Sequence, residues 1–128
     1  MLDAIDNGDS PTIFGTGSEA FDFVNVKDCA KANICAMKSN FKDTFYNVGT
    51  GKKTSLKQLA ELLVKITDCK KSIKYIKQNE KTFVKSRIGC PKKAKKEINF
   101  EFEIDLIDGL KELVKWRDEI KIKKNINF

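Results

Sequence analysis

The order of elements in residues 45–63, FYNVGTGKKTSLKQLAELL, restricts the fold more than any other feature of this sequence. A short apolar run leads into a glycine-flanked turn at Gly49–Gly51, and an amphipathic pattern begins at Ser55. This order is typical of a strand that passes through a tight turn into a helix. Ser55 suits the N-cap of that helix, and Gln58 three positions later would close a capping box. The stretch therefore predicts a strand–turn–helix unit.

The turn does not match the two common glycine-rich phosphate loops. A Walker loop needs a glycine at the position of Tyr46 and a serine or threonine at the position of Lys53. A dinucleotide-binding fingerprint needs a third glycine at the position of Thr54. Because a lone G-x-G is common in turns, we do not predict a phosphate site here.

Strand and helix signals alternate along the chain, which predicts an α/β fold. Asp28 and Asp105 are suited to helix N-termini, and Pro91 is typical of the first turn of a helix. In the last helix the apolar residues repeat with helical spacing. We expect strands at 11–14, 21–26, 45–48 and 72–76, about four helices at 28–39, 55–67, from Pro91 and from Asp105, and the end of a helix at 1–7. The last helix should bury Leu106, Leu110, Leu113 and Val114, with Ile107 and Trp116 at the margin.

The length of 128 residues fits a single domain, 1–128, that can bury a hydrophobic core. We expect the tail, 121–128, to be frayed. The strands are few and short for a complete parallel sheet. The strand expected at 45–48 is apolar on both faces and needs neighbours on both sides. This shortage indicates that the chain is part of something larger.

Composition excludes several classes of site. There is no histidine, so Ser-His and Cys-His nucleophilic systems are absent from this chain. The four cysteines form no C-x-x-C pair, which argues against zinc and favours mostly buried, reduced thiols; they are Cys29, Cys35, Cys69 and Cys90. No apolar run reaches the roughly 20 residues of a membrane helix, and the short acidic start is unlike a secretory signal. We therefore expect a cytoplasmic protein.

The net charge of +7 is unevenly distributed. Residues 70–96 contain eleven lysines and arginines against one acidic residue, Glu80. Such a stretch favours anionic partners, either a nucleotide pyrophosphate or a nucleic acid. Most of these lysines are equally well explained as a solvated surface.

Three motifs in this order carry a resemblance to a known family: PTIFGTGSEAFDFVNVKDCAKA, then the stretch 45–63, then SRIGCPKKAKKEINFEFEIDLIDGLKELVKW. Together they resemble the C-terminal part of the NAD-dependent nucleotide-sugar epimerases and dehydratases, of the extended short-chain dehydrogenase/reductase (Rossmann-type) family. UDP-glucose 4-epimerase is a familiar member. The resemblance covers 11–117 and implies a substrate-binding C-terminal portion without the N-terminal cofactor-binding sheet. The turn at Gly49–Gly51 is then a support for domain packing.

The resemblance also implies substrate-binding residues. Thr12, Ile13 and Phe14 match the segment that lines the uridine base, with Phe14 as an aromatic wall or, alternatively, as ordinary core. Arg87 matches the arginine that grips the pyrophosphate, a role that suits a planar guanidinium. Two positions depart from the family. Phe21 stands where many members have a phosphate-binding arginine, and Cys90 stands where many have an aspartate near the ribose; a thiol is a weak hydrogen-bond partner.

The family's cofactor loop and its catalytic Tyr-x-x-x-Lys are both absent. Tyr46 is followed four places on by Thr50, and Tyr75 by Asn79. NAD belongs to the full-length family, and we expect none to bind this chain alone. The expected partners are a UDP-sugar and a Rossmann half or a chain that carries it, with a homodimer as another possibility. The alternatives are a small basic nucleic-acid-binding protein and a non-catalytic structural or regulatory remnant.

Overall fold

A computed structural model describes residues 1–77 and 84–126 of the protein. This part holds five short strands and five helices, so the α/β class is confirmed; the fifth helix is the one whose end was expected at 1–7. The strands are β1 (Thr12–Phe14), β2 (Ala20–Phe21), β3 (Thr54–Ser55), β4 (Lys74–Ile76) and β5 (Ser86–Arg87). The helices are α1 (Leu2–Asp6), α2 (Val26–Lys38), α3 (Leu56–Ile66), α4 (Lys92–Ile98) and α5 (Leu106–Ile126).

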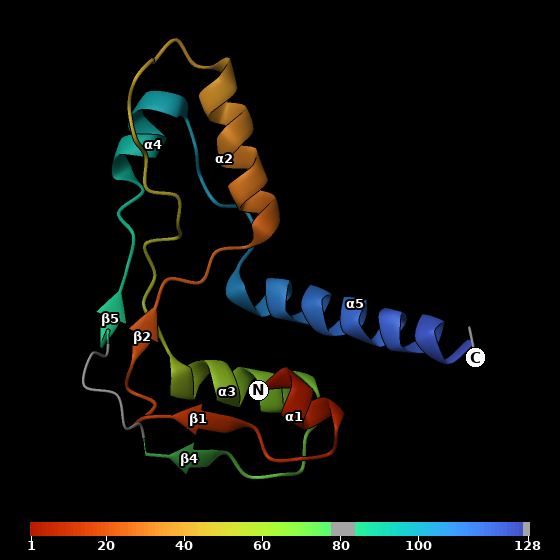
Figure 1. Cartoon of the computed structure of the whole chain (residues 1–128). Helices are drawn as coiled ribbons and strands as arrows, with labels where there is room; N and C mark the ends of the chain where they lie inside the picture. The colour runs from red at the N-terminus through yellow and green to blue at the C-terminus, as the bar shows by residue number, and fades with distance from the viewer. Residues whose placement is uncertain (78–83, 127–128) are drawn as a thin grey trace.

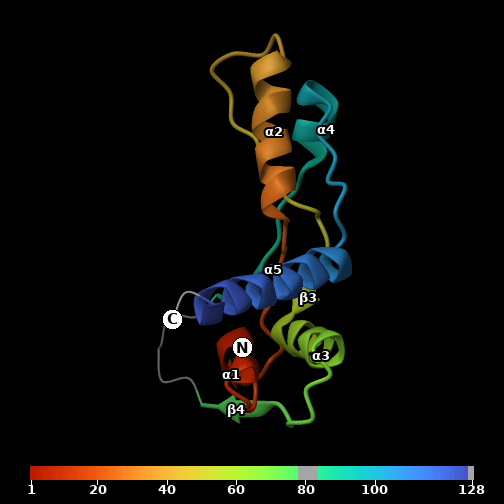
Figure 2. The same cartoon turned by 90° about the vertical axis from the view of Figure 1, so that its right-hand side faces the viewer.

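The strands form two small sheets. In one, β1 pairs in parallel with β4, so the edge strand expected at 72–76 is confirmed. In the other, β2 lies between β3, which is antiparallel to it, and β5, which is parallel to it. Figure 1 shows α1, α3, β1 and β4 together at one end of the molecule, and α2 and α4 at the other end. Helix α5 crosses the middle, as the turned view in Figure 2 shows.

The molecule exposes more surface than a compact protein of its mass. Its accessible surface is 9521 Å², whereas a compact monomer of 14.5 kDa is expected to expose about 6,900 Å². One core cluster joins α2 to α4 and the following segment; it consists of Ala32, Ala94, Ile98 and Phe100. The hydrophobic core expected from the length is therefore small for 128 residues.

The capping box expected at the start of helix α3 is confirmed. The Ser55 hydroxyl accepts from the Gln58 N–H at 3.1 Å, and the Gln58 side chain accepts from the Ser55 N–H at 2.8 Å. Pro91 occupies the N-cap of α4, one position before the first helical residue. Asp105 likewise directly precedes α5.

The strand expected at 21–26 is wrong beyond Phe21. Helix α2 begins at Val26 because Asn25 is its N-cap and accepts from the Lys27 N–H at 2.9 Å. Asp28 is therefore not the cap. It is a buried residue of the helix, and its carboxylate accepts from the N–H groups of Glu103 and Ile104 at 2.9 and 3.1 Å. This contact ties α2 to the segment that precedes α5.

The strand expected at 45–48 is also wrong for the described residues. No strand is assigned there, and within the described part no backbone–backbone hydrogen bond involves 40–49. Tyr46 and Val48 pack against the core cluster, while Phe45 is 92% exposed. The side chains of 45–48 thus alternate between buried and exposed as in a strand, but the described residues provide no neighbouring strand for this segment.

The apolar face of helix α5 is less buried than expected. Leu110 is buried, but Leu113 is 39% exposed, and Trp116 and Ile107 are exposed as well. The backbone is helical as far as Ile126. The expectation that the tail 121–128 is frayed stays a prediction. Among the described residues, none of the helices combines the length and apolar character needed to cross a membrane.

Replacing Asp28 tests the link between α2 and the chain before α5. We expect Asp28→Ala to lower the free energy of unfolding by about 3 kcal/mol, because two buried N–H groups lose a charged acceptor. Urea unfolding followed by circular dichroism measures this change. Asp9→Ala is the matched control at an exposed aspartate, and an equal loss there would contradict the role of Asp28.

Candidate functional site

The turn Gly49–Gly51 binds an anion that comes from the chain itself. The Asp22 carboxylate accepts from the Thr50 N–H at 3.0 Å, from the Thr50 hydroxyl at 2.5 Å and from the Gly51 N–H at 2.9 Å. A Cβ on Gly49 would lie 2.5 Å from Asp22 Oδ2, so only glycine fits. Successive N–H groups in such a turn form a concave anion site. The turn resembles a phosphate loop because it performs the same task for a carboxylate.

Asp22 also fixes the segment that follows β5. Its N–H donates to the Arg87 carbonyl at 3.0 Å. Its carboxylate lies close to Gly89, where a Cβ would be 3.3 Å from Oδ2. Burial raises the pKa of Asp22, but the hydrogen bonds from Thr50, Gly51 and Gly89 outweigh it and bring the pKa below its ordinary value. One carboxylate thus holds together β2, the turn and the segment that carries the candidate residues Arg87 and Cys90.

The structure brings Phe21 and Arg87 together. They are register partners in the parallel pair β2–β5, so their side chains leave the same face of the sheet. Phe21 is half-buried and meets Phe23 edge to face, with ring centroids 6.4 Å apart. Arg87 and Cys90 are exposed. An aromatic ring and an exposed arginine therefore lie side by side on one surface.

The other three candidate residues belong to the separate sheet β1–β4. Phe14 is 59% exposed, so it is not ordinary core. Ile13 is buried, and its side chain is not available to a ligand. Thr12 is half-buried, and its hydroxyl donates to the Ser10 carbonyl at 3.3 Å. Of this segment, Phe14 offers the large accessible surface.

Sequence reasoning missed the buried acidic residues of the first motif. Glu19 accepts from the Thr16 N–H and hydroxyl, both at 3.1 Å, and closes the turn Gly15–Gly17 before β2. The hydrogen bond from its own backbone N–H lowers the pKa of Glu19. Burial raises this pKa, but the hydrogen bonds from Thr16 lower it further, so the net shift is downward. The sequence carries such a signal for Asp22, which interrupts the apolar stretch 20–24, but not for Glu19, which follows the polar turn residues 15–18. A charge there is expected to have a dedicated partner.

Several lysines of the basic stretch have partners within the chain. Lys93 donates to the Thr44 hydroxyl at 2.5 Å and lies 5.0 Å from the Tyr46 ring centroid. Lys95 pairs with Glu101. These lysines stabilise the packing around α4. Residues 78–83 of the stretch lie outside the described part.

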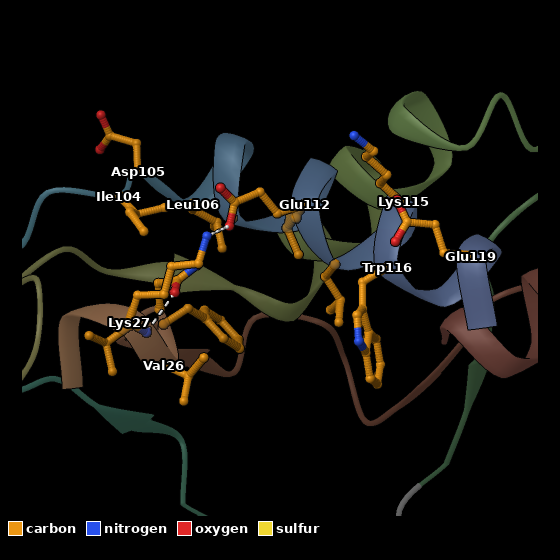
Figure 3. A pocket seen from close by; sticks show the side chains of 15 residues that line it. Val26, Lys27, Ile104, Asp105, Leu106, Glu112, Lys115, Trp116 and Glu119 are labelled. Carbon is orange, nitrogen blue, oxygen red and sulfur yellow. Dashed lines mark hydrogen bonds and ion pairs between the residues drawn. The ribbon is translucent and has the colours of Figure 1, made fainter. Parts of the chain in front are cut away.

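An apolar groove of about 710 Å³ lies between the residues before α2 and helix α5 (Figure 3). Val26, Leu113 and Trp116 contribute to its wall. Lys27 and Glu112 form an ion pair of 2.8 Å at its edge. None of the candidate nucleotide-sugar residues lines this groove. It is therefore a different surface from the candidate site.

All four cysteines are free; three are half-buried and Cys90 is exposed, so the expectation of mostly buried thiols is wrong for Cys90. In the described ranges, no group of three or more His, Cys, Asp or Glu side chains is arranged to hold a metal ion.

Comparisons with known proteins agree with this architecture. Residues 1–49 match the family model "NAD dependent epimerase/dehydratase family". A putative UDP-glucose 4-epimerase of Methanocaldococcus jannaschii is 36% identical over 116 residues, which are 91% of this chain and 37% of that protein. A UDP-glucose 4-epimerase of Thermotoga maritima, solved with UDP-glucose, superposes with a TM-score of 0.84 at 33% identity. The match covers 89% of this chain and 36% of that structure.

A third relative shows the same extent of similarity. The UDP-N-acetylglucosamine 4-epimerase of Methanobrevibacter ruminantium, solved with UDP-N-acetylmuramic acid, has a TM-score of 0.85 at 30% identity and covers 92% of this chain and 37% of that structure. The fold and motifs are thus similar to one part of the NAD-dependent epimerases and dehydratases. Among these, the chain is similar to UDP-glucose 4-epimerase. It spans little more than a third of the length of these relatives.

The Asp22 contacts predict a specific acid sensitivity. Because the folded pKa of Asp22 lies below the ordinary value, its stabilising effect is present at neutral pH and is lost as the pH falls below about 4. We expect Asp22→Asn to lower the free energy of unfolding by about 2 kcal/mol at pH 7 and by less at pH 3. Urea unfolding at both pH values measures this difference. Asp9→Asn is the control, and an equal effect of Asp22→Asn at the two pH values would contradict the account.

Proposed function

We propose that this chain forms the nucleotide-sugar side of an NAD-dependent epimerase or dehydratase and that its ligand is a UDP-sugar. The single observation that carries the proposal is the exposed Arg87 beside Phe21, on a segment that Asp22 holds in place. Relatives at 30% and 33% identity were solved with UDP-linked sugars, which supports a UDP-sugar as the ligand class.

The proposed roles follow from side-chain chemistry. Arg87 binds the pyrophosphate, because a guanidinium donates two parallel hydrogen bonds to phosphate oxygens. Phe14 stacks on the uracil base, since an exposed ring offers a flat apolar face. Phe21 contributes apolar surface beside the pyrophosphate in place of a second cation. Cys90 is near the ribose and contributes a weak hydrogen bond. Thr12 and Ile13 line the base through their backbone.

Hydride transfer and acid–base catalysis need residues that this chain lacks. NAD and the Tyr-x-x-x-Lys pair would be supplied by a Rossmann half that corresponds to the rest of the relatives' length. The contribution of this chain to the reaction is to hold the UDP moiety, so that the sugar can be presented to the cofactor. The nucleic-acid alternative has no support from these relatives, which are nucleotide-sugar epimerases.

Titration of the chain with UDP in a calorimeter tests the proposal. We expect Arg87→Ala to weaken UDP binding by about 10- to 150-fold, which corresponds to about 1.5–3 kcal/mol for hydrogen bonds to a charged group. Lys85→Ala is the matched control, because Lys85 is an exposed cation two residues away. An equal loss in both variants would indicate a general charge effect and contradict a specific pyrophosphate contact, and no UDP binding by the unaltered chain would contradict the proposal itself.

The role of Phe14 is separable from that of Arg87. We expect Phe14→Ala to weaken UDP by about 5- to 150-fold, because stacking of a base on an aromatic ring contributes about 1–3 kcal/mol. Binding of inorganic pyrophosphate should stay unchanged, since it has no base. Phe41→Ala, at another exposed phenylalanine, is the control. A loss of both ligands in Phe14→Ala would show that Phe14 supports the fold and does not contact the base.

A further inference from the structure

The apolar groove beside α5 adjoins the candidate site, although the two share no residue. Phe23 lines the groove, and its ring lies edge to face with the ring of Phe21, with centroids 6.4 Å apart. Phe21 is in turn the register partner of Arg87. The surface proposed for the pyrophosphate therefore continues, through one pair of aromatic rings, into the groove.

The order of these surfaces along the molecule matches the order of the groups in a UDP-sugar. Phe14, proposed for the base, is the last residue of β1, whereas Arg87 belongs to the second sheet. Figure 1 shows β1 at one end of the molecule and the chain running from β2 toward the middle, where α5 lies. A ligand with its base at Phe14 and its pyrophosphate at Arg87 therefore extends its sugar toward Phe23 and the groove.

The groove has the size and the walls of a small-molecule site. Its volume of about 710 Å³ lies within the range of about 300–1,000 Å³ that is usual for ligand pockets. Its walls are mainly apolar and include Val26, Leu113 and Trp116, all of them exposed. Trp116 projects from α5 (Figure 3). Its indole offers a large flat surface on which the C–H groups of a ligand can pack.

Asn25 provides a neutral hydrogen-bond donor in this groove. Its Oδ1 accepts from the Lys27 N–H at 2.9 Å as the N-cap of α2, which fixes the orientation of the amide. A Cβ on Gly109, which also lines the groove, would lie 3.0 Å from Asn25 Nδ2. Among the described residues, no side chain or carbonyl accepts from this Nδ2. The amide group is therefore available to a ligand.

The charges at the groove are nearly balanced. Glu112 pairs with Lys27 at 2.8 Å, and Asp105 pairs with Lys52 at 2.7 Å. Lys115 and Glu119 add one charge of each sign to the lining. This balance favours a neutral sugar substituent over a carboxylate, because an added charge would be removed from water without a cation of its own.

We propose that the groove holds the sugar of a UDP-linked sugar that carries an acetamido group. Such a group combines a carbonyl acceptor with a methyl group. The carbonyl accepts from Asn25 Nδ2, and the methyl group packs on the apolar wall at Leu113 and Trp116. A hydroxyl group at the same place can use the donor but leaves the apolar wall uncovered. This proposal rests on the proposed function, because it needs the UDP moiety at Phe14 and Arg87.

Trp116 makes the test direct, because it is the single tryptophan of the sequence. Its fluorescence is followed while the chain is titrated with UDP, UDP-glucose and UDP-N-acetylglucosamine. We expect UDP to leave the emission unchanged and UDP-N-acetylglucosamine to shift it to shorter wavelength, as the indole leaves water. UDP-N-acetylglucosamine should bind about tenfold tighter than UDP-glucose, through one buried methyl group and one hydrogen bond.

Two variants and a control locate the contact. Asn25→Ser keeps an oxygen at the N-cap but removes the amide donor. It should weaken UDP-N-acetylglucosamine by about 2- to 12-fold and leave UDP unchanged. Leu113→Ala should weaken UDP-N-acetylglucosamine at least threefold. Ile107→Ala is the matched control, because Ile107 is an exposed apolar residue of the same helix that does not line this groove. Circular dichroism checks that the variants keep their helix content.

The outcomes separate this proposal from the proposed function. Equal affinities for the three ligands, or an unchanged Trp116 emission with UDP-N-acetylglucosamine, would overturn the sugar site alone, since UDP binding would still stand. An equal loss in Leu113→Ala and Ile107→Ala would also overturn the sugar site alone. If UDP-glucose bound as tightly as UDP-N-acetylglucosamine, the assignment of an acetamido group would be wrong. An absence of binding for all three ligands would overturn both proposals.

Discussion

The carboxylate of Asp22 in the turn Gly49–Gly51 is the interaction on which the candidate site depends. It joins three segments that are far apart in the sequence: strand β2, the turn before α3, and the chain that follows β5. Because the N–H groups of the turn are committed to this carboxylate, they are not free for a phosphate. The anion that a ligand brings must therefore be met by a side chain, and Arg87 lies on the segment that Asp22 positions.

The buried Asp28 performs the corresponding task where helix α2 meets the chain that leads into α5. Asp28 lies within α2 and accepts from two N–H groups before α5. Two carboxylates six residues apart thus connect the first motif to the second and third motifs. This explains why three separated stretches of the sequence occur together: they are held by side-chain-to-backbone contacts, which two-residue strands could not replace.

The sequence predicted the elements whose signals are local. The capping box of α3 depends on residues three apart, and it is present as expected. The strand expected at 21–26 was wrong beyond Phe21, and the strand expected at 45–48 was wrong throughout. A strand needs a partner, and in the described chain no strand lies beside 23–26 or 45–48. The expectation that Leu113 is buried was wrong for a similar reason. Helical spacing shows that one face of a helix is apolar, but it does not show what covers that face. The pairing of Phe21 with Arg87 depends on sheet register, which local patterns do not contain.

The central claim is that the surface around Arg87 binds a uridine nucleotide. Mapping the backbone amide signals of the chain by nuclear magnetic resonance during a titration with UDP tests it most directly. The account predicts that the largest shifts occur at Phe14, at Arg87 and at Gly89, with little change along α2. Shifts confined to the lysines of α4, or to the groove beside Trp116, would contradict it.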